Sequence, residues 1–448
     1  MNNQKLLYWS IVVALAGFLF GFDTVVISGA EQSLQALWKD HTFLGSNDNF
    51  HGYVVVGSAL FGTIFGALFG GFPTNSIGRK NTLIWIGVLY TISALGSAYA
   101  VNPWVFALFR FVGGLGVGAS TIAAPAYVSE IAPANSRGRM VALYQFNIVF
   151  GILIAFVSNY VIGTYVGSEA WRWMVGVEAI PAIIYTLMVF NVPKSPRWLL
   201  ANRKDEVGAR NVLAALYPPE QIDPKIVEIQ SVEQPQVKEN IFQKRYRLPV
   251  LLAFAIAFFN QFSGINAFLY YSKRIFEEAG LGDQAALLGS IGIGAVNLVF
   301  TILGMALIDR LGRKQLMYFG SVGYILSLAY VALAFFMGWQ GLSIPIALFV
   351  FIAAHAIGQG AVIWVFISEI FPNHLRSYGQ SIGTSTHWVL AWIIPASVPV
   401  LMSTIGAGSV FAIFAGMMVL QLLWVAFIMP ETKGVPLEEL SKRLAKDT

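Results

Sequence analysis

Apolar runs of about 20 residues or more dominate this 448-residue chain, and they leave it few ways to fold. A helix needs about 20 apolar residues to cross the roughly 30 Å hydrocarbon core of a membrane. Charged residues make up only 11% of the chain, against about 25% in a typical soluble domain. The sequence lacks the alternating segments of about ten residues that a membrane β-barrel requires. These features predict an integral membrane protein built from helices.

Twelve runs are long enough to span the membrane, so we predict an all-α fold with twelve transmembrane helices. They are residues 6–34, 52–72, 82–101, 103–129, 140–163, 171–191, 248–275, 285–308, 315–337, 343–367, 378–403 and 407–429. The first run is too long for the core of a signal peptide, and we expect it to be the first membrane helix. The chain has no cysteine, which excludes disulfides and cysteine-bound metals.

Basic residues are distributed unevenly among the predicted loops. If the chain crosses the membrane twelve times, all but five of its 28 lysines and arginines lie on one side. The exceptions are Lys39, Arg110, Arg172, Lys273 and Arg274. Positively charged loops remain in the cytoplasm, so we expect both termini to be cytoplasmic. Because the basic residues are spread over many short loops, we expect no nucleic-acid partner.

Three short motifs of the first half of the chain return in the second half at nearly one offset. They are Gly78-Arg79-Lys80, which returns as Gly312-Arg313-Lys314; Ser129-Glu130, which returns as Ser368-Glu369; and Pro193-Lys194, which returns as Pro430-Glu431. This repeat predicts two six-helix halves related by an axis along the membrane normal, as in one known transporter architecture. We expect halves at 1–192 and 248–448, joined by a polar cytoplasmic linker with short helices at 193–247.

Asp23 and Arg110 interrupt two of the apolar runs. A charge at bilayer depth costs at least ~2.5–3.5 kcal/mol on insertion scales, so such residues are usually paired and functional. At about 1.5 Å per residue, Asp23 lies roughly 25 Å up the first helix, and Arg110 lies roughly 10 Å down a helix that enters from outside. Their depths match, so we expect them to meet. A dry carboxylate beside an arginine is a candidate proton switch, because its affinity for a proton depends on whether the arginine is near.

Further stretches of the chain carry a family resemblance. They are Gly21-Phe22-Asp23-Thr24-Val25-Val26-Ile27-Ser28-Gly29, Ser76-Ile77-Gly78-Arg79-Lys80, Pro193-Lys194-Ser195-Pro196-Arg197-Trp198, Gln261-Phe262-Ser263-Gly264-Ile265-Asn266, Asp309-Arg310-Leu311-Gly312-Arg313-Lys314 and Pro430-Glu431-Thr432-Lys433-Gly434. Over nearly its whole length the chain resembles the sugar porter family of the major facilitator superfamily. The resemblance implies a monosaccharide transporter of that fold.

A sugar offers hydroxyl groups and weakly apolar ring faces, which amide and aromatic side chains suit. The predicted spans supply ten such candidates, namely Gln145, Asn260, Gln261, Asn266, Asn297 and His387, with Phe20, Tyr270, Trp364 and Trp388. Resemblance implies that Gln145, Gln261, Asn266, Asn297 and Trp364 line the sugar site. A lone amide can instead serve only to join helices, and a lone tryptophan can serve only as packing or as an interfacial anchor.

The stretch around Gly264 carries a structural prediction of its own. Gln261 and Asn266 are five residues apart, or roughly 140° around a helix, so they share a face only if the helix is locally unwound. Gly264 between them makes such a break accessible. Asn260 and His387 depart from the family, which usually has glutamine at the first position and glutamine or asparagine at the second. These departures put the preferred sugar in doubt.

Resemblance also assigns the charged residues. It implies that Asp23 is the proton site of proton-coupled members, with Arg110 as its partner and Glu178 as a second buried acid. Six residues at cytoplasmic helix ends are expected to form an inner gate, namely Arg79, Glu130, Arg137, Arg313, Glu369 and Arg376. Lys194 replaces the usual glutamate of its motif, and Ser76 replaces a basic residue. Both changes are expected to weaken the inner salt-bridge network.

These features predict a proton-coupled hexose or pentose symporter of a bacterial-type inner membrane, acting as a monomer on sugar and protons and needing no cofactor. A facilitative uniporter would have the same fold without coupling. A transporter-like sugar receptor is disfavoured, because such proteins carry long cytoplasmic tails and only residues 430–448 follow the last run. An enzyme is disfavoured because the sequence has no nucleophile–base pairing and no cluster of metal ligands.

Overall fold

The computed structural model of the chain is helical throughout the part that it describes, namely residues 3–133, 136–231, 240–372, 375–435, 439–440 and 443–444. Among these residues the only β-type pairing is an isolated bridge between Phe43 and Ser46. The loops between the described membrane-length helices are short, as the close succession of long apolar runs predicts. The all-α prediction is therefore confirmed.

Within the described residues, eleven helices are long and apolar enough to cross a membrane. They cover Asn3–Leu37, Asn47–Phe69, Arg79–Ala98, Pro103–Ile131, Gly138–Tyr165, Ala170–Phe190, Lys244–Tyr270, Asp283–Leu311, Arg313–Phe336, Ser343–Glu369 and Tyr378–Phe427. The last is a double-length stretch that bends at Gly406, whose φ of 79° is outside the helical range. This bend falls between the predicted runs 378–403 and 407–429, so each of the twelve runs has its helix.

The chain divides into two compact units, and the first span is divided between them after Asp23. Unit 1 comprises Met1–Asp23, Phe61–Ile152 and Val175–Gln236, and unit 2 comprises Thr24–Leu60, Leu153–Met174 and Val237–Thr448. Unit 2 thus contains contacts between segments of the first predicted half and the whole second half. The two six-helix halves remain a prediction from the sequence repeat.

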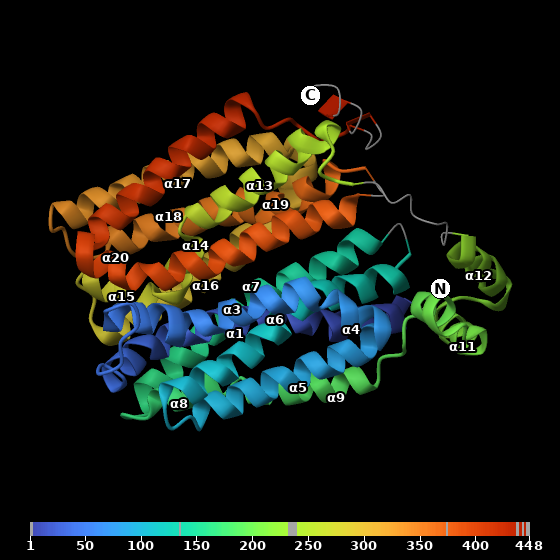
Figure 1. Cartoon of the computed structure of the whole chain (residues 1–448), viewed down its shortest axis with the longest axis horizontal. Helices are drawn as coiled ribbons and strands as arrows, with labels where there is room; N and C mark the ends of the chain where they lie inside the picture. Colours follow the sequence, from blue (N-terminus) through green and yellow to red (C-terminus); the bar gives the residue numbers. More distant parts are fainter. Residues whose placement is uncertain are drawn as a thin grey trace. The chain divides into compact units, whose positions relative to one another are not determined.

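Unit 1 holds the N-terminal part of the first span and all or part of the second to sixth spans (Figure 1). Its helices are α1 (Asn3–Leu37, as far as Asp23), α3 (Gly57–Phe69, from Phe61), α4 (Gly71–Ser76), α5 (Arg79–Ala98), α6 (Pro103–Ile131), α7 (Arg137–Tyr165, as far as Ile152), α8 (Ala170–Gly176, from Val175), α9 (Ala179–Phe190), α10 (Pro196–Trp198), α11 (Glu206–Leu216) and α12 (Ile222–Ser231). Glycines let α3 and α6 approach closely, since a Cβ on Gly62 would lie 2.1 Å from the carbonyl oxygen of Phe111.

The helices of the predicted linker form a small cluster of their own within unit 1. In Figure 1, α11 and α12 lie beside the N-terminus, away from the long helices. Trp198, Leu213 and Ile226 form part of the core that joins α10, α11 and α12. Over the residues that the structure describes, the linker is therefore folded and contains short helices, as expected for 193–247.

Unit 2 holds Thr24–Leu60, which ends the first span and begins the second, together with Leu153–Met174 and the second half of the chain. Beyond its share of α1, α3, α7 and α8, its helices are α2 (Asn47–Asn49), η1 (Phe50–Val56), η4 (Lys244–Tyr246), α13 (Arg247–Phe262), α14 (Ile265–Tyr270), α15 (Ser272–Glu278), α16 (Asp283–Leu311), α17 (Arg313–Phe336), α18 (Ser343–Ile357), α19 (Gln359–Glu369) and α20 (Arg376–Phe427). The helix that contains the predicted break stops at Phe262, and Gly264 adopts a left-handed φ of 81° before α14 begins.

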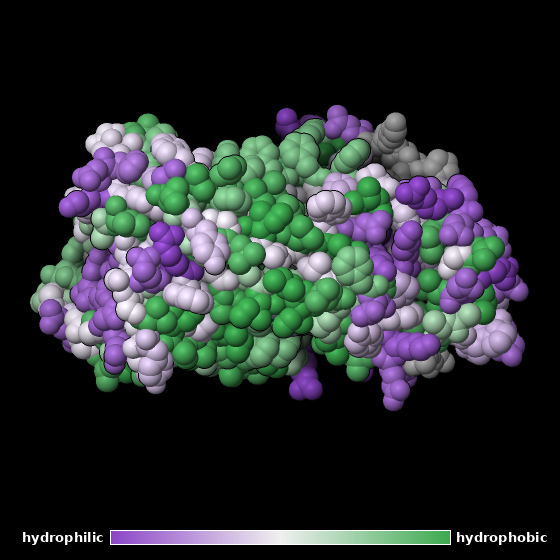
Figure 2. Space-filling model, turned by 90° about the horizontal axis from the view of Figure 1, so that it is seen from below, coloured by the Kyte–Doolittle hydropathy of each residue, from purple (hydrophilic) through white to green (hydrophobic). Residues whose placement is uncertain are grey.

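The surface carries the polarity that a membrane requires. Figure 2 shows one face on which hydrophobic residues gather along the middle and hydrophilic residues gather toward both ends. Large apolar side chains such as Trp85 of α5 and Leu187 of α9 are more than half exposed. Lipid, rather than water, suits such side chains, because the bilayer core needs an apolar surface.

Candidate functional site

Asp23 and Arg110 are in direct contact in unit 1, as their matching depths predict. Each is only 2% exposed. Arg110 donates from Nη1 to Asp23 Oδ1 and from Nη2 to the carbonyl oxygen of Asp23, the second contact at 3.2 Å. The guanidinium therefore holds both the side chain and the backbone of α1 at this point.

Glu178 joins this pair and makes it a cluster of three ionisable groups. It lies between α8 and α9, is 1% exposed, and interacts with both Asp23 and Arg110. Its Oε1 has no hydrogen-bond partner in the part of the chain that the structure describes. The site therefore brings two carboxyl groups and one guanidinium together away from solvent. If all three groups were ionised, the cluster would carry one uncompensated negative charge.

A second polar group surrounds Gln261 at the helix break in unit 2. Gln261 Nε2 donates to Asn260 Oδ1 at 2.9 Å and lies 3.1 Å from Nδ1 of His387. Asn266 Nδ2 donates to Gln261 Oε1 at 2.8 Å. This last contact confirms that the break at Gly264 brings Gln261 and Asn266 to one place.

Aromatic rings adjoin this polar group. The rings of Trp364 and His387 have centroids 5.1 Å apart, and those of His387 and Trp388 are 4.9 Å apart at 87°. His387 thus contacts both the amide group and the two indole rings. Amides and aromatic rings are the two elements that a pyranose needs.

The other predicted sugar-site residues are placed less closely. Asn297 is buried in α16 and has Thr301 Oγ1 3.4 Å from its Oδ1. Tyr270 is buried at the end of α14. Gln145 of α7 and Phe20 of α1 belong to unit 1. Asn260, Gln261, Asn266, Trp364, His387 and Trp388 therefore form a connected group, and the sugar-binding role of all ten residues remains a prediction.

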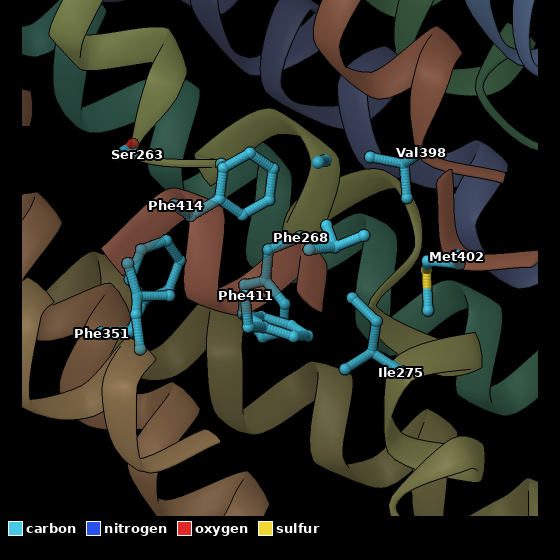
Figure 3. A pocket seen from close by; sticks show the side chains of 12 residues that line it. Ser263, Phe268, Ile275, Phe351, Val398, Met402, Phe411 and Phe414 are labelled. Atoms are coloured by element: carbon cyan, nitrogen blue, oxygen red, sulfur yellow. The ribbon is translucent and has the colours of Figure 1, made fainter. Parts of the chain in front are cut away.

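An apolar pocket lies on another side of the same helix break. Figure 3 shows Phe268, Phe351, Phe411 and Phe414 around it. Ser263 is the one hydroxyl-bearing residue among those that line it. Sugar hydroxyls need many hydrogen-bonding partners, so this pocket does not have the chemistry of the predicted sugar site.

The predicted inner-gate residues form two ion pairs, one in each unit. Arg79 Nη2 lies 2.8 Å from Glu130 Oε1, and Arg313 Nη2 lies 2.7 Å from Glu369 Oε1. Arg376 is partly buried in the first turn of α20. Arg137 begins α7, but its side chain lies outside the described residues. A gate that joins the two pairs is therefore still a prediction.

One cluster of charged groups was missing from the sequence-based site. In unit 2, Glu31 is fully buried and contacts both His51 and Arg274. A signal for it was present, because Glu31 and Arg274 are charged residues within apolar runs, as Asp23 and Arg110 are. Each lies near the end of its predicted run, 6–34 and 248–275, where a charged residue alone does not indicate a buried pair.

Comparison with known proteins identifies the family. The family described as "Sugar (and other) transporter" matches residues 9–444. The chain belongs to the sugar porter family. Its relatives include the putative metabolite transport protein YwtG of Bacillus subtilis, 37% identical over 99% of this chain and 96% of that protein. The D-xylose-proton symporter of Escherichia coli is 32% identical over 98% of this chain and 96% of its own length.

A solved structure confirms the fold of this sugar porter. The xylose transporter XylE of Escherichia coli, in a partially occluded inward open conformation, matches with a TM-score of 0.86 and 30% identity. The match covers 97% of this chain and 100% of the other. The predicted major facilitator fold with twelve helices is therefore confirmed, and the chain is a multi-pass membrane protein of a sugar-transporting family.

Proposed function

We propose that this sugar porter is a proton-coupled symporter of a hexose or pentose, which acts as a monomer in the inner (cytoplasmic) membrane with both termini cytoplasmic. The observation that carries the proposal is the buried cluster of Asp23, Arg110 and Glu178. A relative is named as a D-xylose-proton symporter, which agrees with such coupling.

The composition of the cluster favours proton binding. Two carboxyl groups share one guanidinium in a site without solvent, so the cluster is neutral only when one of the two acids is protonated. The unpartnered Oε1 of Glu178 is also less costly to bury in the neutral form of that side chain. A proton that enters the cluster therefore changes which of the acids pairs with Arg110.

That change can be coupled to the movement of α1. When Asp23 is ionised, Arg110 holds both its side chain and its backbone carbonyl. Protonation of Asp23 removes one charge of the pair, and breaking a buried pair costs ~3–5 kcal/mol. A change of that size shifts a two-state equilibrium by well over tenfold. Proton binding thereby alters the balance between outward-facing and inward-facing states of the two halves.

The group around Gln261 supplies the proposed sugar site. Its amides are already paired with one another and with His387, so a sugar must exchange these contacts for its own hydroxyls. Amides both donate and accept, which allows that exchange without a charged group losing its water. Compared with the usual residues of the family, Asn260 has a shorter amide side chain, and His387 has an imidazole in place of an amide. The tested sugars should therefore include a ketohexose such as fructose.

Uptake into proteoliposomes tests this function. Purified protein is reconstituted, and a panel of hexoses and pentoses is supplied with and without an imposed pH gradient. For the transported sugar, we expect accumulation above the external concentration only with the gradient. Asp23→Asn should abolish this accumulation and retain sugar counterflow, because exchange needs no net proton movement.

Glu169→Gln is the matched control, because Glu169 is an exposed carboxylate that pairs with Arg172 and is not one of the three residues of the cluster. It should accumulate sugar as the unmodified protein does. Accumulation by Asp23→Asn would contradict proton coupling at this site. Counterflow that is insensitive to pH, with no accumulation under any gradient, would instead identify a facilitative uniporter.

A further inference from the structure

Glu31, His51 and Arg274 form a buried polar cluster that the proposed mechanism does not use. Glu31 of α1 is fully buried and His51 of η1 is 1% exposed. Arg274 of α15 donates to Glu31 from Nε at 3.0 Å and from Nη2 at 2.5 Å. His51 Nε2 lies 2.8 Å from Glu31 Oε2. A carboxylate only accepts hydrogen bonds, so His51 donates here.

His51 serves here as a hydrogen-bond donor to Glu31. Its Nδ1 has no hydrogen-bond partner among the described residues. A ring with its proton on Nε2 leaves only an acceptor unsatisfied at Nδ1. The groups that face the cluster are the Arg274 guanidinium, the rings of Tyr271 and His51, and the carboxyl group of Glu278. Asp48 lies further out, where it accepts from Gln35. Glu31 therefore receives three charge-assisted bonds from two sides.

Further contacts extend the cluster along the same two elements. Gln35 Oε1 of α1 accepts from Arg274 Nη2 at 2.5 Å. Gln32 of α1 donates to Glu277 Oε2 at 2.6 Å, and its Oε1 accepts from Lys273 Nζ at 3.3 Å. Three residues of α1 thus contact three residues of α15, all through polar groups.

The position of this contact in the chain shows that it joins the two predicted halves. α1 and η1 belong to the first predicted six-helix half, and α15 belongs to the second. The contact lies eight residues beyond Asp23 toward the end of α1 that we place outside the cell. In alternating access the two halves separate at one end and then at the other. The contact must therefore break each time the outer end opens.

We propose that Glu31, His51 and Arg274 are the positioning residues of an outer latch, which holds the outer ends of the halves together until the transporter opens outward. This inference rests on the proposed function for its direction and its moving halves. Arg274 closes the latch on Glu31, and His51 fixes the carboxylate to receive it. These bonds favour the fully closed state over a partly closed one. If Arg274 moves away while Glu31 stays buried, the carboxylate loses its cation, which is costly.

A reversible cross-link tests whether the contact must open. The chain contains no cysteine, so Gln32→Cys with Lys273→Cys creates one defined pair across the latch. We expect oxidation to abolish both uptake and counterflow in proteoliposomes, and a reductant to restore them. The control is Ser272→Cys with Ser290→Cys, whose hydroxyls are 3.0 Å apart within the second half. Oxidation of that pair should leave transport within twofold of the reduced protein.

Counterflow separates this inference from proton coupling. If coupling fails but the latch is real, the cross-link still stops counterflow in a protein that never accumulates sugar. If the oxidised Gln32–Lys273 pair transports at the reduced rate, the latch is refuted whatever the coupling.

A distance measurement tests the roles of the three residues. Spin labels are placed on Leu37→Cys and Leu342→Cys, two exposed positions of α1 and of the loop before α18. Glu31→Gln, Arg274→Gln and His51→Leu should each raise the ratio of long to short distances, by on the order of tenfold for the first two. His51→Gln retains a donor and should restore the distribution of the unmodified protein. Unchanged distributions in Glu31→Gln and Arg274→Gln would overturn the proposal.

Discussion

The repeated Gly-Arg-Lys motif is built twice in this chain, and the two copies agree in nearly every contact. Arg79 pairs with Glu130 in unit 1, and Arg313 pairs with Glu369 in unit 2. Each arginine also donates from Nη1, at 3.1 Å, to the carbonyl oxygen five residues before it. The preceding glycine has a φ of 92° in the first copy and 96° in the second, which only glycine adopts without strain.

The agreement extends to the hydroxyl that supports each glutamate. Ser195 Oγ donates to Glu130 Oε2 at 2.5 Å, and Thr432 Oγ1 donates to Glu369 Oε2 at 2.6 Å. These residues hold corresponding places in the Pro193-Lys194 and Pro430-Glu431 motifs. The two copies are therefore one structural device used twice.

The copies differ at the residue before this hydroxyl. Glu431 accepts from the backbone N–H groups of Arg313 and Lys314, each at 3.0 Å, and so caps α17. Lys194 holds the corresponding place in the motif of the first copy, and its side chain is exposed. Among the described residues, no side chain caps the first turn of α5. A carboxylate at a helix N-terminus is favourable and a cation is not, so the first copy lacks a stabilising contact that the second has.

The largest expected effect comes from removing the paired glutamates. Glu369→Gln should lower the free energy of unfolding by about 2–3 kcal/mol, because Arg313 then loses the partner that both its Nε and its Nη2 contact. Glu130→Gln should cost about 1–2 kcal/mol, since Arg79 uses a single oxygen of Glu130. Unfolding in detergent micelles, followed by circular dichroism, measures both losses.

Glu169→Gln is the control for this comparison, because its ion pair is exposed and should contribute little. A loss in Glu130→Gln equal to or greater than that in Glu369→Gln would show that the geometry of the pair does not set its strength.

The second test concerns the residue at which the copies differ. Glu431→Ala should cost about 1–2 kcal/mol, because two N–H groups of α17 lose a charged acceptor. Lys194→Ala is its matched counterpart and should cost nothing measurable, or stabilise slightly. Thermal unfolding of the two variants side by side gives the comparison. Equal losses would mean that the cap on α17 contributes no more than the lysine does.

The third test concerns the supporting hydroxyls. Ser195→Ala should cost about 1 kcal/mol, because Ser195 also accepts from the N–H of Trp198 and so caps α10. Thr432→Val removes only the bond to Glu369 and should cost less, about 0.5 kcal/mol. The same unfolding assay separates them. A larger loss in Thr432→Val would assign the stabilising role to the glutamate bond and not to the cap.

Much of this architecture could be predicted from the sequence because it follows from local rules. Twelve apolar runs fix the spans. Counting residues along two helices places Asp23 opposite Arg110, and five-residue spacing with Gly264 requires the break that brings Asn266 to Gln261. Each of these predictions depends on the distance along one helix or on one backbone conformation.

The remainder depends on which segments pack together, and local rules do not determine that. Glu31 meets Arg274 only because the C-terminal end of α1 packs against α15 in unit 2. Lys194 was expected to weaken the inner salt-bridge network, yet the pair of Arg79 and Glu130 is intact and the contact that is missing is a backbone cap. A substitution in a motif shows that a contact changes, but the structure shows which one.

The smallest expected effect is a gain in the free energy of unfolding. Lys194→Glu places a carboxylate where Glu431 stands in the second copy, next to the uncapped N-terminus of α5. The expected stabilisation is about 0.3–1 kcal/mol, because the position is exposed and solvent screens the new charge. The converse variant Glu431→Lys should lose stability at the other copy. Thermal unfolding at low and high salt measures both, and the gain should shrink as salt rises. A gain that does not depend on salt would point to packing of the new side chain and not to its charge.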